Sequence, residues 1–196
     1  MTKTIAITGG IGSGKSTFCS KLKEKGFKIH SSDEEVAKIY KNPEKKFVTY
    51  LRAIGLSKSI SKKNINKKTI SKIIFENKQI RKKLELYIFK IVRKKRLDFI
   101  KQEKEKRTRL IFIDIPLLFE NNLEKQFHKV ISIIAPKQER LKRLKKTRKM
   151  SETQFKNIIR SQTSDIIRKK KSDYVVYNNS TLKDYKTKIN KLINKL

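Results

Sequence analysis

The run at residues 9–16 has the composition and spacing of a phosphate-binding loop. It reads Gly-Gly-Ile-Gly-Ser-Gly-Lys-Ser and matches the pattern G-x-x-x-x-G-K-[ST] in full. Lys15 is expected to reach the β- and γ-phosphates of a nucleotide, and the Ser16 hydroxyl is expected to reach Mg²⁺. Backbone amides of the loop would converge on the phosphate oxygens. Four glycines are expected to permit this through positive φ angles: Gly9, Gly10, Gly12 and Gly14.

The residues around this run predict the strand and helix that such a loop connects. Residues 4–8 form a short apolar segment with β-branched residues, which is typical of a buried strand. Residues 17–25 carry apolar side chains at helical spacing, and Gly26 follows them as a stop signal. A strand, a glycine loop and a helix in this order are the context that the motif requires.

Two carboxylates follow predicted strands and are candidates for chemistry. Asp33 comes just after the strand predicted at residues 27–30, where it could take a proton from a phosphoryl acceptor. A helix N-cap explains Asp33 equally well, because Glu34 and Glu35 follow it. Asp114 ends the strand predicted at residues 109–115 and could hold Mg²⁺ through water, or could serve as a turn residue.

Three polar residues near the C-terminal half are weaker candidates. Arg140 and Arg143 lie one helical turn apart in the helix predicted after Pro136, where Arg143 could stabilise charge on a transferred phosphoryl group. A solvated helix face is the alternative. Asn178, beyond the strand predicted at residues 174–177, could border an adenine pocket or form part of a turn.

The two histidines and the single cysteine are interpreted as structural. No Cys or carboxylate lies at zinc-ligand spacing from His30 or His128. Cys19 is expected to be a small core residue of the first helix and not a nucleophile.

The order of the predicted elements indicates an α/β fold. Strands alternate with helices along most of the chain, whereas residues 41–107 are helical apart from a polar connection at 55–66. Residues 67–106 form a strongly helical stretch, and further helices are expected from Ser151 and over the last residues of the chain. The pattern predicts a parallel sheet with an inserted helical region.

The charge of the chain is extreme but has two explanations. Lys and Arg number 52 against 18 Asp and Glu, which gives a net charge of +34 over 196 residues. Such an excess can indicate a nucleic-acid partner. The lysines are spread along the chain, however, and aromatic residues that could stack on bases are sparse. We therefore expect a solvated surface and no specific nucleic-acid binding.

Location is expected to be cytoplasmic. No segment approaches the ~20 apolar residues of a membrane-spanning helix. A strand begins at the N-terminus, so no signal peptide is expected, and one cysteine cannot form an internal disulfide.

Several motifs, in order and across nearly the whole chain, resemble those of the dephospho-CoA kinase family. In chain order, these motifs are the run at 8–17, Asp33, the helical region at 65–92, Ile115-Pro-Leu-Leu-Phe-Glu120, the segment from Ser151 and Glu152 to Gln162, and Asp173-Tyr-Val-Val-Tyr-Asn178.

The resemblance implies a P-loop NTPase fold of three layers, with a parallel sheet, an inserted helical substrate region and a helical lid. It implies a single kinase domain, with a core at 1–40, 108–143 and 171–196, a substrate-binding insertion at 41–107 and a lid at 144–170. A monomer is expected.

The resemblance also implies a reaction, in which the γ-phosphate of ATP passes to the ribose 3′-hydroxyl of dephospho-CoA to give coenzyme A. Asp33 would be the general base, and an arginine of the lid region, Arg143 or Arg148, would contact the transferred phosphate. The ATP phosphates would be held by Gly12, Ser13, Gly14, Lys15, Ser16 and Thr17, with Arg140 and Asn178 nearby.

The chain departs from the family pattern at three places. Ser31-Ser32-Asp33 replaces Asp-Ala-Asp, so only the second carboxylate is present. Phe89-Lys90 replaces a His-Pro pair, which weakens an acceptor-binding role there. Thr147-Arg148-Lys149 differs from the usual lid sequence, so the sequence leaves open whether Arg148 or the pair of Arg140 and Arg143 does the work of the lid arginine.

Two other functions remain compatible with the loop. A nucleoside or nucleoside-monophosphate kinase would keep the ATP site and change the acceptor. A nucleic-acid-binding NTPase is less consistent with the sequence, because no Asn-Lys-x-Asp guanine signature is present.

Overall fold

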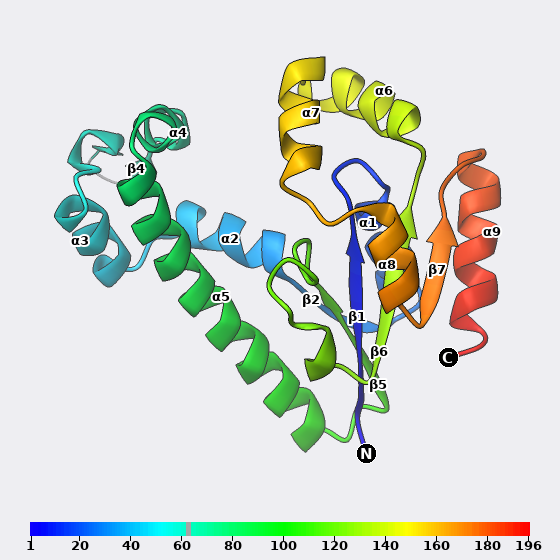
Figure 1. Ribbon diagram of the computed structural model, residues 1–196. Coiled ribbons are helices and arrows are strands. Elements are labelled where there is room, and N and C mark those ends of the chain that lie inside the picture. Colours follow the sequence, from blue (N-terminus) through cyan, green and yellow to red (C-terminus); the bar gives the residue numbers. More distant parts are fainter. Residues whose placement is uncertain (62–63) are drawn as a thin grey trace. The chain divides into compact units, whose positions relative to one another are not determined.

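The computed structural model describes residues 1–61 and 64–196 (Figure 1). The described chain forms two compact units. The first comprises Met1–Ser31 together with Ile100–Leu196, and the second comprises Ser32–Phe99. In the described chain, no helix combines the length and the apolar character needed to cross a membrane.

The first unit is built on a parallel sheet. Its strands are β1 (Lys3–Gly9), β2 (Lys28–Ser31), β5 (Leu110–Asp114), β6 (Lys129–Ile134) and β7 (Tyr174–Tyr177), in the spatial order β2-β5-β1-β6-β7. All four pairings are parallel, so the carboxyl ends of the strands meet at one edge. The register places Asp114 opposite both Ile7 and Ser31. This edge therefore carries the residues that follow each strand.

Helices cover both faces of this sheet, as the sequence predicts. On one face, Ile5 and Ile7 of β1 join a core with α1 (Lys15–Glu24) and α9 (Leu182–Ile193). α1 ends at a Lys25 C-cap, and Gly26 follows with a φ of 81°, which confirms the predicted stop. On the other face, α8 (Asp165–Lys171) packs against β6.

The segment between β6 and β7 is helical. α6 (Lys137–Arg148) and α7 (Glu152–Arg160) lie above the carboxyl ends of the strands, over the loop between β1 and α1 (Figure 1). Ser151 and Gln154 form a capping box that starts α7. The resemblance implies a helical lid at 144–170, but no local pattern predicts α8 within it, because Ile166 and Ile167 are exposed, whereas Arg168 is 1% exposed. A short 3₁₀ turn, η2 (Glu124–Gln126), precedes β6.

The second unit is mainly helical. Its elements are α2 (Ser32–Lys41), α3 (Lys45–Ala53), η1 (Ser57–Ser59), β3 (Ile60–Ser61), β4 (Asn64–Ile65), α4 (Lys67–Glu76) and α5 (Lys78–Glu105), the last of which continues into the first unit.

The stretch predicted as helical at 67–106 is two helices, because the Asn77 side chain accepts hydrogen bonds from the amides of Gln79 and Ile80 and starts a new helix. Short elements interrupt the polar connection at 55–66, of which residues 62 and 63 lie outside the described part. A core of Phe47, Leu51, Leu56, Ile70 and Leu84 holds the unit together.

Asp173 joins the start of β7 to β6, and this link should depend on pH. Its carboxylate accepts the Val130 amide at 2.8 Å and the Lys129 ammonium at 2.7 Å. Burial raises the pKa of this carboxyl, but the bonds from Lys129 and Val130 outweigh burial and leave the pKa below its usual value. A lowered pKa stabilises the fold above the unfolded-state pKa, and this contribution is lost as the pH falls through the folded-state pKa.

We therefore expect Asp173→Asn to lower the free energy of unfolding by about 1 kcal/mol at pH 7. The difference from the parent protein should shrink in acid, and urea unfolding at a series of pH values measures it. Asp98→Asn, at an exposed position of α5, is the matched control and should change little. A deficit that is the same at pH 7 and in acid would contradict this account.

Candidate active site

The loop between β1 and α1 has the geometry of an anion site. α1 begins at Lys15 with Gly14 as N-cap at a φ of 98°, and Gly12 has a φ of 73°. No acidic residue lies in the first turn of α1, and no side chain caps it. The first amides of a helix have no partner within the helix, so those of α1 are available to phosphate oxygens.

Gly9 and Gly10 differ from the expectation of positive φ. Only Gly12 and Gly14 of this loop adopt such angles. At Gly10, close approach is the reason for glycine, since a Cβ there would lie 2.3 Å from a guanidinium nitrogen of Arg140. At Gly9, a Cβ would lie 2.6 Å from the Ile133 carbonyl oxygen.

Lys15 and Asp114 form an ion pair at the carboxyl edge of the sheet. The Lys15 Nζ lies 2.5 Å from Asp114 Oδ1, and the Ser31 hydroxyl donates to Asp114 Oδ2 at 3.1 Å. The side chains of Lys15 and Asp114 are only 13% and 7% exposed. The parallel register explains the bond between Ser31 and Asp114, because these two residues are opposed at the ends of β2 and β5. Asp114 thus lies beside the loop, as its predicted metal role requires.

Carbonyl oxygens of the loop are held by side chains from distant parts of the chain. Arg140 Nε donates to the Ile11 oxygen at 2.7 Å, and Asn178 Nδ2 donates to the Ser13 oxygen at 2.8 Å. The remaining donors are Arg143 to Gly12 at 3.5 Å, the Tyr185 hydroxyl to Gly14 at 3.1 Å and the Ser13 amide to Gly10 at 3.1 Å. Every carbonyl from Gly10 to Gly14 therefore has a donor, which holds the loop in place before the first turn of α1.

Arg143 lies against the loop, whereas Arg148 does not. Besides Gly12, Arg143 donates to the backbone oxygen of Asn178 at 3.3 Å and to its side-chain oxygen at 3.2 Å. Arg148 is the last residue of α6 and is exposed, and no hydrogen bond or ion pair of its side chain is recorded within residues 1–61 and 64–196.

Arg140 and Asn178 contact the loop backbone; the resemblance predicted them near the ATP phosphates but not these bonds. Arg140 is 2% exposed and pairs with Asp165 at 3.3 Å in addition to its bond to Ile11. Asn178 is 6% exposed, and its amide is occupied by Ser13 and Arg143. These bonds hold the loop, and a direct contact of either residue with a nucleotide is still only a prediction.

The remaining loop residues are open to solvent to different degrees. The Ser16 side chain is exposed, Thr17 and Gly12 are half-buried, and Ser13 is buried. Ser16 makes no recorded side-chain hydrogen bond within the described residues, so its hydroxyl is available to a ligand.

Asp33 belongs to the second unit. It is exposed, and it is the second residue of α2, which begins at Ser32. The N-cap interpretation does not fit these bounds, because the cap would precede Ser32. An acidic residue in the first turn of a helix is still stabilised by the helix dipole. Asp33 can therefore stabilise the start of α2 as well as act in catalysis.

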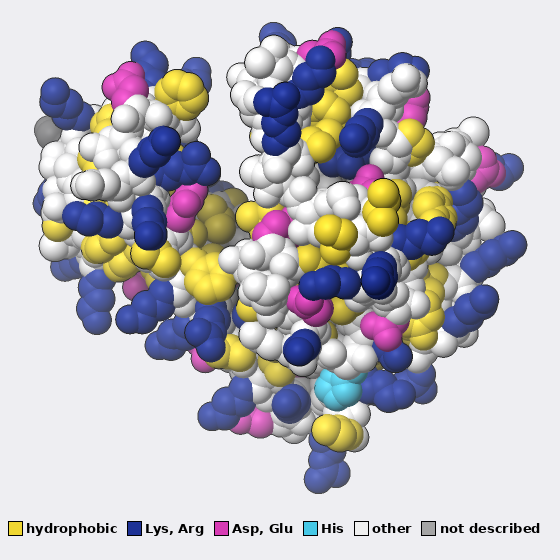
Figure 2. Space-filling model, viewed as in Figure 1, with side chains coloured by type: hydrophobic (Ala, Val, Ile, Leu, Met, Phe, Trp, Pro, Cys, Tyr) yellow, Lys and Arg dark blue, Asp and Glu magenta, His cyan; other side chains and the backbone are white. Residues whose placement is uncertain are grey.

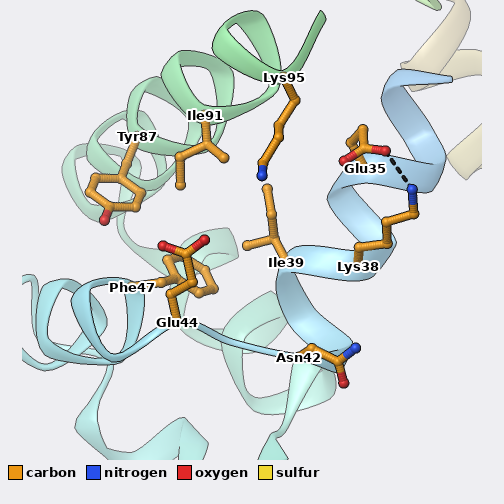
Figure 3. A pocket seen from close by; sticks show the side chains of 9 residues that line it. All are labelled: Glu35, Lys38, Ile39, Asn42, Glu44, Phe47, Tyr87, Ile91 and Lys95. Atoms are coloured by element: carbon orange, nitrogen blue, oxygen red, sulfur yellow. Dashed lines mark hydrogen bonds and ion pairs between the residues drawn. The ribbon is translucent and has the colours of Figure 1, made fainter. Parts of the chain in front are cut away.

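The second unit contains a small cavity of about 190 Å³ (Figure 3). Phe47, Tyr87 and Ile91 supply apolar surface, and Tyr87 is itself stacked on Tyr50 at 4.0 Å between ring centroids. Lys95 points toward the cavity from α5 (Figure 3). The other lining residues are Glu35, Lys38, Ile39, Asn42 and Glu44.

Sequence reasoning missed two direct contacts to the loop. Gln162 Oε1 accepts the Ile11 amide at 3.1 Å, and the Tyr185 hydroxyl reaches Gly14. Burial raises the pKa of Tyr185, so this hydroxyl stays protonated and able to donate. Only the order of the family's motifs pointed to Gln162, and no local signal pointed to Tyr185. The histidines and Cys19 are buried or hydrogen-bonded within the fold, with His128 Nδ1 accepting the Thr4 amide at 3.1 Å.

Lysine and arginine side chains are distributed over the surface. On the face that Figure 2 shows, they lie among polar and apolar side chains of both units. No group of three or more His, Cys, Asp or Glu residues that could hold a metal ion occurs in the described part of the chain. A metal at this site would therefore need few protein ligands.

Known proteins match this chain over nearly its whole length. The family model described as dephospho-CoA kinase matches residues 3–184. A dephospho-CoA kinase of Fusobacterium nucleatum is 38% identical over 188 residues, which cover 94% of each chain. Another from Bacillus licheniformis is 30% identical over 196 residues, covering 98% of this chain and 96% of that protein.

Solved structures show the same fold. A dephospho-CoA kinase from Campylobacter jejuni superimposes with a TM-score of 0.73 at 31% identity, covering 100% of this chain and 97% of that one. TT1252 from Thermus thermophilus has a TM-score of 0.78 at 25% identity, with 100% and 98% coverage. A shikimate kinase from Acinetobacter baumannii, at 19% identity and a TM-score of 0.52 over 100% and 94% of the chains, shares the fold only. The fold is thus that of P-loop kinases, and the chain belongs to the dephospho-CoA kinase family.

Proposed function

We propose that this chain catalyses the reaction of its family with the loop at 9–17 as the ATP site and Asp33 as the general base. The reaction transfers the γ-phosphoryl group of ATP to the ribose 3′-hydroxyl of dephospho-CoA, giving coenzyme A and ADP. The observation that carries the proposal is the Lys15–Asp114 pair beside the Gly14-capped start of α1. It joins a phosphate-binding cation to a carboxylate at the edge where parallel sheets bind ligands.

The loop binds the polyphosphate of ATP. Amides of the first turn of α1 contact its oxygens, and Lys15 turns from Asp114 to the β- and γ-phosphates when the nucleotide is present. Gly12, Ser13, Gly14, Ser16 and Thr17 complete the cradle. Positioning and charge stabilisation supply most of the catalysis in reactions of this class.

Ser16 and Asp114 are the residues that would hold Mg²⁺. The ion prefers hard oxygen ligands and keeps several waters, so one exposed hydroxyl and one carboxylate suit it. Ser16 would bind directly and Asp114 through water. The ion would neutralise charge on the β- and γ-phosphate oxygens.

Asp33 accepts the proton of the 3′-hydroxyl as its oxygen attacks the γ-phosphorus. The bond from the γ-phosphorus to the bridging oxygen breaks, ADP leaves, and the proton passes from Asp33 to solvent. Asp33 follows Ser31 by two residues, and Ser31 bonds to Asp114. Chain connectivity alone therefore keeps the Asp33 Cα within about 7 Å of the Ser31 Cα.

Arg143 is the proposed arginine for the transferred phosphoryl group. Its guanidinium already lies at the Gly12 carbonyl, and planar donors of this kind suit the equatorial oxygens of the transition state. The residues at 144–170 form the lid, and Gln162 connects this segment to the loop.

The helical insertion at 41–107 is the proposed site for dephospho-CoA. The cavity of the second unit supports this role, since Lys95 offers a cation for an anionic group and Tyr87 offers a ring face. All proposed residues come from one chain, so a monomer suffices. Cys19 is a buried free thiol, which suits the reducing cytoplasm.

The choice of acceptor tests the proposed function directly. ADP release should depend on dephospho-CoA and stay at background with UMP, CMP, AMP or nucleosides. A coupled assay of ADP formation, with product identified by mass, measures this. Transfer to a nucleoside monophosphate, or ATP hydrolysis stimulated by RNA or DNA at physiological salt, would replace the proposal with one of those functions.

Asp33→Asn should lower kcat by about 100-fold or more, because the amide cannot accept the proton. ATP affinity should change less than about twofold, since the proposal assigns the polyphosphate to the loop and not to Asp33. Steady-state kinetics and a fluorescent-nucleotide titration separate the two quantities. Glu34→Gln, the next residue of the same helix turn, is the control. A normal rate in Asp33→Asn would remove Asp33 from the mechanism.

Arg143→Ala and Arg148→Ala should differ in rate. Loss of Arg143 removes a donor beside the loop and should lower kcat by about 100-fold. Loss of the exposed Arg148 should change kcat by about twofold at most. Single-turnover rates at saturating ATP give the comparison. The reverse order of effects would assign the phosphoryl contact to Arg148 and would require α6 to rearrange in the closed enzyme.

A further inference from the structure

A group of paired charges, with both of its arginines buried, is connected to the ATP loop at Ile11. It consists of Glu120, Arg140, Asp165 and Arg168, all in the first unit. We propose that Glu120 is a positioning residue for the ATP site, acting on the Ile11 peptide through the segment at 162–168. This inference rests on the proposed function of the loop as the ATP site.

Glu120 holds the start of this segment in place. Its Oε1 accepts the Thr163 amide at 2.7 Å and an Arg168 guanidinium nitrogen at 3.1 Å. Glu120 lies in the chain that follows β5, and its side chain is 16% exposed. One carboxylate oxygen thus fixes both the backbone just after α7 and the buried cation of α8.

Two paths lead from this point to Ile11. On the first, Gln162, which adjoins Thr163, accepts the Ile11 amide at 3.1 Å. On the second, Arg168 pairs with Asp165 at 3.0 Å, Asp165 pairs with Arg140 at 3.3 Å, and Arg140 donates to the Ile11 oxygen at 2.7 Å. Both polar backbone groups of Ile11 are therefore held by residues that Glu120 orders.

Charge balance makes Glu120 important to the second path. Arg140 and Arg168 are 2% and 1% exposed, and Glu120 and Asp165 are their recorded carboxylate partners. Burial lowers the pKa of Arg140, Asp165 opposes this, and the like charge of Arg168 lowers it further. Without the charge of Glu120, Asp165 would have to neutralise two buried guanidiniums.

The Ile11 peptide is a sensitive point in the loop. It joins Gly10, which packs against the Arg140 guanidinium, to Gly12, which has a positive φ. Glycines on both sides leave the peptide free to rotate unless other groups hold it. A rotation would redirect the amides that bind the polyphosphate, and misplacement by about 1 Å can be costly in rate. Glu120 should therefore affect ATP more than dephospho-CoA.

Glu120→Gln tests this with Glu124→Gln as a matched control. Glutamine keeps an acceptor oxygen for Thr163 and removes the charge. Glu124 also pairs with a cation of α8, Lys171 at 2.9 Å, and both glutamates have a buried Oε2 without a recorded hydrogen-bond partner among the described residues. Glu124 has no recorded bond to the loop or to residues 162–168.

Glu120→Gln should raise the KM for ATP and the Kd of a fluorescent ADP analogue by about 5- to 10-fold. The KM for dephospho-CoA should stay within about twofold of the parent value. Glu124→Gln should leave all three constants within about twofold of the parent values, even if it lowers the melting temperature as much as Glu120→Gln does. Equal changes in both KM values, no change in nucleotide affinity, or the same effect in Glu124→Gln would overturn the proposal.

A double-mutant cycle with Gln162→Ala separates positioning from general destabilisation. If Glu120 acts on Ile11 partly through Gln162, the double variant should bind the ADP analogue more tightly than the product of the two single effects predicts. Multiplicative effects would contradict that path. Should Glu120→Gln not fold, Glu120→Asp enters the same cycle, with the charge kept and the reach shortened.

The outcome is distinguishable from failure of the proposed function. Parent enzyme that binds the ADP analogue but does not phosphorylate dephospho-CoA would refute the acceptor assignment. The nucleotide affinities of the Glu120 variants would still report on positioning, because that measurement needs no acceptor.

Discussion

A single buried carboxylate, Asp114, determines how the candidate active site is arranged. Asp114 is 5% exposed, and a carboxylate taken this far from water needs a cation or strong donors. Lys15 and the Ser31 hydroxyl meet that need, and each comes from a different strand end or loop. The parallel register of β1, β2 and β5 brings the three together, so the pairing of strands and the chemistry of the edge depend on each other.

A second constraint on the loop is that its carbonyl oxygens need hydrogen-bond donors, and most of these donors are side chains from outside the loop. Side chains far away in sequence donate to the carbonyls from the outer side, chief among them Arg140, Asn178 and Tyr185. Because backbone polar groups must be paired when they are buried, these donors allow a tight loop and leave the first amides of α1 available to a phosphate. Residues of the C-terminal third of the chain thus hold the backbone of a loop that lies near the N-terminus in sequence.

The sequence predicted the elements that local signals encode. The loop, the parallel strands, Asp114 at a strand end and the Gly26 stop all follow from patterns within ten or so residues. The sequence could not assign partners across long separations: it predicts Asn178 at an adenine pocket or in a turn, and it gives no sign that the Asn178 side chain donates to the Ser13 carbonyl oxygen. α8 escaped prediction for a related reason, since a buried Arg168 and exposed isoleucines contradict the usual pattern until Glu120 and Asp165 are placed beside it.

The extreme charge of the chain and the local charges of the site obey different constraints. With 52 cations and 18 carboxylates, the surface field is positive, and exposed lysines can vary in number because salt screens them beyond about 10 Å. Ion pairs that are buried or partly buried are screened much less. Asp114, Glu120 and Asp165 each face a specific cation at 3.3 Å or less. A lysine-rich composition can therefore spread over the surface while these three carboxylates keep their positions, because each of them balances a cation whose side chain is at most 13% exposed.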